Sequence, residues 1–235
     1  TLRLKYSQGY TPSFVDGTSV CIDQQNNIWD WSNNYFSKSN IDPSNLIEVV
    51  DGNVVATNIL SRTFQDITSL LRVSRLYAPN TTSILGLFSG CTALQSVAGF
   101  QPSTEVTHLI SLFAGCSSLQ SVNLFETHAV TSVVSMFSRS SSIEYIPPFD
   151  FSNCTDMDTA FRSCESLLAL PSSNFSNAVT MRNTFENCSS LTTIPPMNLS
   201  KVEDMRFAFS GCSELTAIPA ITVSVVDDCH GAFNW

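Results

Sequence analysis

The chain has 235 residues, enough for one or two domains with a sizeable core, and its 43% hydrophobic content excludes a disordered protein. Only 13% of the residues are charged, about half the usual share, so serine, threonine and asparagine must supply the polar surface. The net charge of −9 disfavours nucleic acids and anionic membrane surfaces as partners, and no apolar run is long enough to span a bilayer.

Residues 1–45 lack the repeat that fills the rest of the chain. Their first six residues alternate between apolar and polar side chains, which predicts a strand. Because an array of repeats needs a cover at its end, we interpret residues 1–45 as a β-rich cap or linker region. The sharper alternative makes Trp29, Trp31 and Tyr35 a stacking platform for carbohydrate, since alternate residues of a strand share one face.

Residues 46–235 carry a repeat of 24 residues, with a single step of 25. The clearest column is phenylalanine, at Phe64, Phe88, Phe113, Phe137, Phe161, Phe185, Phe209 and Phe233. Four other apolar columns keep the same register at four residues before this phenylalanine and three, six and nine residues after it. We therefore predict one continuous array of about seven repeats, the last of them truncated.

The spacing within one repeat predicts its local structure. Met205, Phe209 and Cys212 stand at i, i+4 and i+7, which is one face of a short helix, and Gly211 suits a left-handed C-terminal position. The following residues 215–219 are too few for another helix and are typical of a short strand. The predicted fold is therefore an α/β solenoid of leucine-rich-repeat geometry, with a parallel sheet on one side and short helices on the other.

The cysteines follow the repeat. Of the eight, five share one column, three residues after the phenylalanine: Cys91, Cys116, Cys164, Cys188 and Cys212. Side chains of one column in a solenoid point in parallel at roughly 4.7–4.9 Å spacing, which suits packing and not disulfide geometry. We therefore expect buried, reduced thiols, and expect Cys154 and Cys229 to point inward as well.

The segment from Phe185 to Pro195 (FENCSSLTTIP) resembles the BspA-like leucine-rich repeats of bacterial surface proteins. The segment of residues 209–215 resembles them as well. The pattern of that family, Phe-x-x-Cys-x-x-Leu-x-x-Ile after a Ser-x-Val-x-x-Met start, is also matched by residues 200–205 (SKVEDM). The resemblance covers about residues 56–235. It departs from the pattern at Ser140 and Ile67, which replace cysteine, and at Ile143, which replaces leucine.

The resemblance implies display on a cell surface and adhesion to host or neighbouring cells through protein or glycan binding. Similar repeats occur in phage tail and receptor-binding proteins, so a virion component that binds a host receptor or builds the particle is the alternative. The location implied is extracellular or cell-surface, or else the virion.

The sequence predicts neither catalysis nor a cofactor or metal. The three histidines, His108, His128 and His230, fall at different positions of the repeat, and the motifs of common hydrolases and nucleotide-binding enzymes are absent. Binding is more plausible, on the outward columns of the strand side, which are small and mostly uncharged. There Tyr145 is the one residue of a type that dominates interfaces.

We therefore predict a non-enzymatic recognition module with tentative ligand-binding residues at Tyr145, Glu144, Arg72, Asn123, Trp29, Trp31 and Tyr35. The expected partner is a protein or glycan of a host or neighbouring cell, without membrane insertion. Because no strand follows Phe233, we also expect a homo-oligomer or further chain to cover the C-terminal edge of the solenoid.

Overall fold

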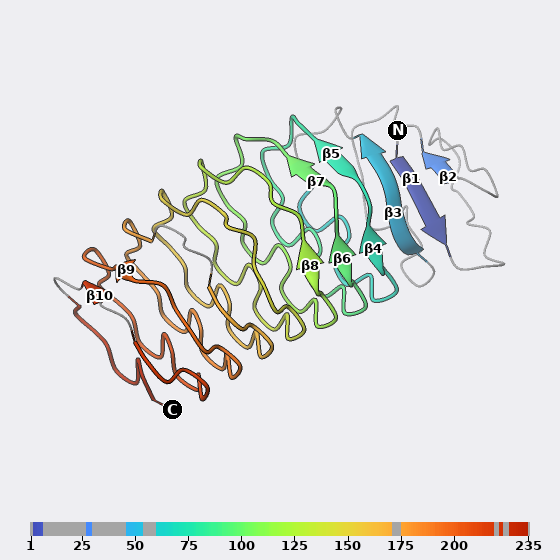
Figure 1. The fold of residues 1–235 in the computed structure, drawn as a ribbon. Coiled ribbons are helices and arrows are strands. Elements are labelled where there is room, and N and C mark those ends of the chain that lie inside the picture. The colour runs from blue at the N-terminus through green and yellow to red at the C-terminus, as the bar shows by residue number, and fades with distance from the viewer. Residues whose placement is uncertain are drawn as a thin grey trace.

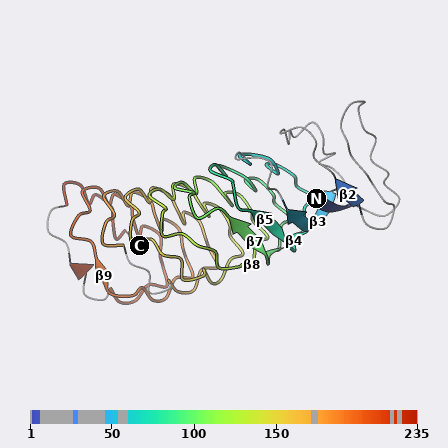
Figure 2. The same ribbon diagram turned by 90° about the horizontal axis from the view of Figure 1, so that it is seen from above.

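The chain folds into a curved solenoid in which each repeat forms one coil stacked on the next (Figure 1). The structure is a computed structural model that describes residues 2–6, 27–29, 46–53, 60–170, 175–218, 221–222 and 226–234. Figure 2 shows the same stack of coils from above, with the core enclosed between their two sides.

An eight-stranded sheet covers the N-terminal part of the molecule. Its first strands, β1 (Leu2–Tyr6) and β2 (Asn27–Trp29), pair antiparallel, and β1 also pairs antiparallel with β3 (Leu46–Asn53). From β3 onward the pairing is parallel, through β4 (Arg72–Val73), β5 (Leu76–Ala78), β6 (Ser96–Val97), β7 (Phe100–Pro102) and β8 (Ser121–Val122). Each coil thus adds its strands to those of the coil before it.

Later coils continue this stacking through single bridges and short strand pairs. A parallel bridge joins Ala169 to Thr193, and the two-residue strands β9 (Met197–Asn198) and β10 (Ile221–Thr222) pair in parallel. Another set of parallel bridges runs along the solenoid through His108, Ser132, Asp156, Thr180, Asp204 and Asp228.

The side predicted to hold short helices consists of consecutive turns, and the described residues contain no helix. The N–H of Thr63 donates to the carbonyl of Leu60 at 3.2 Å, a turn bond, whereas the N–H of Phe64 donates to Leu87 of the next coil at 3.0 Å. An α-helix keeps its hydrogen bonds within its own segment, so the prediction of helices and of an α/β class is wrong.

Left-handed residues explain why the helical spacing does not form a helix. Two positions per coil have positive φ, two residues before and two residues after the column phenylalanine, and each such residue breaks a right-handed helix. The prediction that Gly90, Gly115, Asn187 and Gly211 are left-handed is confirmed, with φ of 75°, 74°, 60° and 74°, although they belong to turns.

The column phenylalanines form a continuous stack through the core. Ring centroids of successive members are 5.2–5.8 Å apart from Phe64 to Phe233, in nearly parallel planes. All but Phe233 are essentially buried. Burying one such side chain contributes about 1.5–3 kcal/mol, so the stack is a main source of cohesion between coils.

The column cysteines are buried free thiols, as predicted, and each also donates a hydrogen bond. The Sγ of Cys188 lies 3.1 Å from the carbonyl of Phe161 in the preceding coil, and the other four bond in the same way at 2.9–3.2 Å. Ser140 takes over this role with a bond of 2.7 Å to Phe113. Cys154 is buried too, but Cys229, in the last described coil, is exposed, so the prediction that it points inward is wrong.

We predict that Ser140→Ala lowers stability by about 0.5–1.5 kcal/mol, because the buried carbonyl of Phe113 loses one of its two donors and keeps only the N–H of Cys116. Ser140→Cys restores a donor and the residue found in most other coils, so its loss should stay below about 1 kcal/mol. Urea denaturation followed by circular dichroism measures both variants. Equal midpoints for the two variants would contradict the hydrogen-bonding role of this column.

Site-resolved alkylation with iodoacetamide should label Cys229 first among the described cysteines of the folded chain. Burial raises the pKa of Cys154 to about 12 and of Cys212 to about 11, so at pH 8 these thiols stay protonated and unreactive. The denatured chain is the control and should expose every thiol. Fewer than six free thiols there, or rapid labelling of Cys188 in the folded chain, would contradict the buried column.

Candidate functional site

The strand side of the solenoid presents an exposed surface of low charge. We define the strand face by two adjacent columns: Arg72, Ser96, Ser121, Tyr145, Ala169, Thr193 and Ala217, and Leu71, Gln95, Gln120, Glu144, Leu168, Thr192 and Thr216. The charged members of these two columns are Arg72 and Glu144. Along most of its length the face therefore presents small side chains and few charges.

Tyr145 interrupts this small-residue surface. Its side chain is 63% exposed, and Leu124, in the loop after β8 of the preceding coil, is 56% exposed. Both values exceed those of every other large hydrophobic side chain whose burial the structure describes. Glu144 is exposed beside Tyr145 in sequence. The predicted pair Tyr145 and Glu144 thus lies on the surface, and the preceding coil carries an exposed leucine that the sequence did not single out.

Arg72 lies on the same face but not at the same place. It belongs to β4, three coils before Tyr145, and each coil advances by one strand spacing of roughly 4.7–4.9 Å, so the two positions are about 14 Å apart. Its Nε is 3.8 Å from the carboxylate of Glu48 in β3. Arg72, which the sequence also predicts as a ligand-binding residue, therefore lies on a different part of the strand face from Tyr145.

The side chain of Asn123, which the sequence predicts as a ligand-binding residue, makes hydrogen bonds within the fold. Its Oδ1 accepts from the N–H of Phe100 at 2.8 Å, and its Nδ2 donates to the carbonyl of the same residue at 2.8 Å. The side-chain amide thereby completes the hydrogen bonding of β7. Both ends of the amide are occupied within the chain.

The aromatic residues of the N-terminal region remain predictions. Trp29 ends β2, where it pairs with Leu2, but its side chain is outside the described part of the structure. Trp31 and Tyr35 lie outside the described residues altogether.

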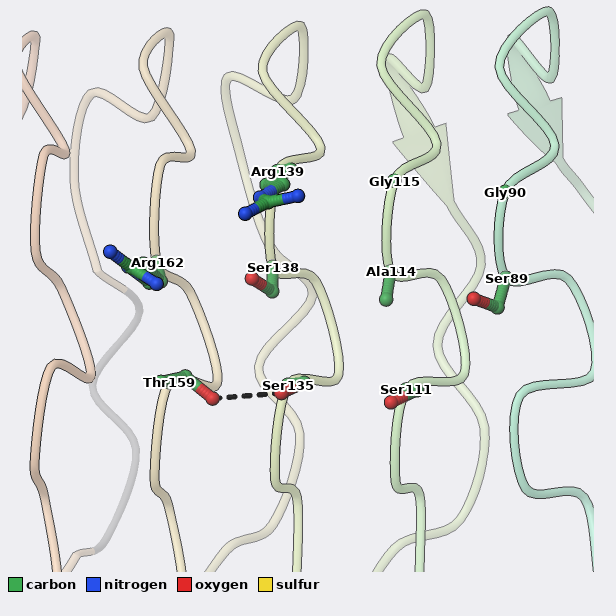
Figure 3. A pocket seen from close by; sticks show the side chains of 10 residues that line it. All are labelled: Ser89, Gly90, Ser111, Ala114, Gly115, Ser135, Ser138, Arg139, Thr159 and Arg162. Atoms are coloured by element: carbon green, nitrogen blue, oxygen red, sulfur yellow. Dashed lines mark hydrogen bonds between the residues drawn. The ribbon is translucent and has the colours of Figure 1, made fainter.

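A polar groove crosses four coils on the turn side (Figure 3). It has a volume of about 460 Å³ and is open to solvent. We call it the turn groove; its lining residues are Ser89, Gly90, Ser111, Ala114, Gly115, Ser135, Ser138, Arg139, Thr159 and Arg162. In Figure 3 the hydroxyl groups of Ser135 and Thr159 form a hydrogen bond, which measures 2.8 Å. The groove therefore combines small residues, hydroxyl groups and two guanidinium groups.

The two arginines of the turn groove differ in their partners. The Nε of Arg162 is 2.6 Å from a carboxylate oxygen of Glu186 in the next coil. Arg139 is exposed, and within the part of the chain that the structure describes no side chain pairs with its guanidinium group. Arg139 thus keeps its charge available at the groove.

Ion pairs join side chains on the neighbouring surface. Arg182 donates to Asp158 at 2.6 Å, and Arg206 donates to Asp204 at 2.6 Å while its Nε lies 3.4 Å from Asp228. The hydrogen bond from Arg206 lowers the pKa of Asp204. Because these side chains are partly or fully exposed, such pairs contribute little stability, and they consume the arginines that form them.

The histidines do not form a common site. His108 bonds to the hydroxyl of Thr107, whereas His128 lies 3.2 Å from Glu126 and lowers the pKa of that carboxyl group by hydrogen bonding. The ring of His230 packs edge-on against Phe207. Among the residues with described positions, no group of three or more His, Cys, Asp or Glu side chains could hold a metal ion.

The family model described as "Mycoplasma protein of unknown function, DUF285" matches residues 58–173 and 179–234. The chain belongs to this family. The match spans the described coils, including the turn groove and the strand face. A search of curated proteins found no match to this DUF285 chain.

Solved structures with similar folds are leucine-rich-repeat proteins. The leucine-rich-repeat protein of T. pallidum (TpLRR) is 21% identical, with 75% of each chain covered and a TM-score of 0.50. A leucine-rich-repeat protein from Bacteroides ovatus is 15% identical, with a TM-score of 0.46; the match covers 89% of this chain and 55% of that one. The DUF285 chain therefore has a leucine-rich-repeat fold with parallel strands.

Within the residues that can be described, no helix of this DUF285 chain is long and apolar enough to cross a membrane. The turn groove was missed by sequence reasoning because its columns were assigned to helices. A signal was present: Arg139 stands in the column that holds Gly90, Gly115 and Gly211 in other coils.

We predict that Asn123→Ala lowers stability by about 1–3 kcal/mol, because the N–H and carbonyl of Phe100 lose their partner, and leaves ligand binding unchanged. Gln120→Ala, at an exposed position nearby, is the control and should change stability by less than about 0.5 kcal/mol. Thermal denaturation of both variants checks this. Equal midpoints would show that the amide does not support β7.

Proposed function

We propose that this chain is a non-enzymatic recognition module, displayed on a cell surface, that binds a protein of a host or neighbouring cell through its strand face. The observation that supports this best is the exposure of Tyr145 on the strand face, where most members of its column are small and uncharged, together with the exposure of Leu124 in the loop after β8. Tyrosine is among the residues that dominate binding energy at interfaces.

The architecture suits such a role. Stacked coils create an extended surface whose residues are fixed by the ladders beneath them, so little ordering is needed on binding. The neighbours of Tyr145 in its column, Ser121 and Ala169, are small and leave its ring accessible to a partner. A partner that covered Tyr145 and Leu124 would remove two large apolar side chains from water.

Adhesion as the biological purpose also follows the resemblance to BspA-like repeats. A leucine-rich-repeat fold alone does not choose a ligand, because function resides in the side chains that the fold presents. For this reason the proposal rests on Tyr145 and its surroundings and not on the family.

The test is a binding screen of the labelled chain on immobilised extracellular-matrix proteins, a glycan array and intact cells. We expect saturable binding to a protein, and Tyr145→Ala should weaken it about tenfold to thirtyfold, the usual effect of truncating an interface hot spot. Thr193→Ala, an exposed position of the same column two coils away, is the matched control and should bind like the parent chain.

Two results would contradict the proposal. A folded chain that binds nothing in the screen would exclude a recognition role for this module by itself. Saturable binding that Tyr145→Ala and Leu124→Ser leave unchanged would place the interface elsewhere on the molecule.

A further inference from the structure

The turn groove is a second candidate site, separate from the strand face. It exists because two adjacent coils carry very small residues where a third carries arginine: Gly90 and Gly115 lie in the column of Arg139. Figure 3 shows these positions side by side, with Ser89, Ala114, Ser138 and Arg162 in the neighbouring row. The small residues form a shallow channel that leads to the two guanidinium groups.

We propose that the turn groove binds a carboxylated saccharide, with Arg139 as the residue that pairs with the carboxylate. This site is independent of the strand face and of the protein partner proposed for it. The structure supports it through the position and the charge of Arg139, which is unpaired in the described part of the chain, and through the chemistry of the lining.

The backbone of Arg139 is unusual for its residue type. Its φ is 63°, a left-handed conformation that costs a non-glycine residue about 1–2 kcal/mol. Gly90 and Gly115 occupy the corresponding positions without that cost. A left-handed φ recurs at this position in the other coils, for example at Asp66 and Ser163, so the fold itself accounts for it. The place of Arg139 in the groove lining and the lack of a partner for its guanidinium group among the described residues indicate a role in binding.

The lining selects the class of ligand. A guanidinium group pairs with a carboxylate through two parallel hydrogen bonds. The hydroxyl groups of Ser89, Ser111 and Ser138 can both donate and accept, which matches the hydroxyl groups of a sugar. The groove crosses four coils, a distance of about 14 Å at the usual strand spacing, so it can hold a short extended chain.

The overall charge makes the site selective. With a net charge of −9, the protein repels anions at long range, so an acidic ligand must be held by specific contacts. Arg162, which is already paired with Glu186, contributes less charge to the ligand than Arg139 does. Arg139 is therefore the residue whose removal tests the site.

The experiment is an NMR titration of the full chain with 3′-sialyllactose and with trigalacturonic acid, two sources of a sugar carboxylate. We expect at least one of them to shift the amide signals of Gly90, Gly115 and Arg139, whereas neutral lactose should not. Arg139→Gln should weaken binding about tenfold or more, the effect of losing a charge-assisted hydrogen bond.

Arg62→Gln is the matched control, because Arg62 is exposed, has a φ of 59° and lies outside the groove lining, so the same charge is removed elsewhere on the turn side. It should bind like the parent chain, and so should Tyr145→Ala, which separates this site from the strand face. Both variants are checked for unchanged thermal denaturation.

Several outcomes would overturn the proposal. These are no shift with either acidic sugar, equal loss of binding in Arg139→Gln and Arg62→Gln, or binding of lactose as strong as that of 3′-sialyllactose. Tighter binding of inorganic sulfate or of hexaglutamate at the same amides would replace the saccharide with a simple anion or an acidic peptide.

Discussion

The structure depends on one constraint: each coil must satisfy its backbone hydrogen bonds in the coils on either side of it. On the turn side the N–H groups of Arg62 and Phe64 donate forward to the next coil, and on the strand side the N–H of Gln95 donates back to Leu71. A single coil cannot meet this requirement, because buried polar groups without partners are costly. The stacked phenylalanines and cysteine thiols then fill the space that these ladders enclose.

This constraint also separates what the sequence could predict from what it could not. The apolar columns predicted the repeat, the stacked core and the buried thiols, because each column must face inward whatever the local backbone. The i, i+4, i+7 spacing of Met205, Phe209 and Cys212 is shared by a helix and by a series of turns. The turns depend on left-handed residues such as Ser135 and Thr159. A positive φ cannot be predicted from these residue types, because serine and threonine rarely adopt one.

The same distinction between predictable and unpredictable features applies to the residues of the candidate sites. The outward columns of the strand face lie between two buried apolar columns, such as those of Ile143 and Ile146, so Tyr145 and Glu144 could be predicted as exposed. The side chain of Asn123 bonds to Phe100, and that of Arg72 pairs with Glu48. These contacts join different coils, and an alignment of the repeats does not contain them. The turn groove depends on the turn geometry itself, so it could not be predicted while that side was assigned to helices.

A regular solenoid makes departures from its own pattern informative. Ser140 departs from the cysteine column yet keeps the hydrogen bond of that column, so its role is structural. Its neighbour Arg139 departs from Gly90 and Gly115, which precede it in its column, and its guanidinium group gains no internal contact among the described residues. A substitution that preserves a contact of the fold needs no further explanation, whereas a charged side chain that makes no contact within the fold needs a benefit outside it. In this chain that benefit is best sought in what the turn groove can bind.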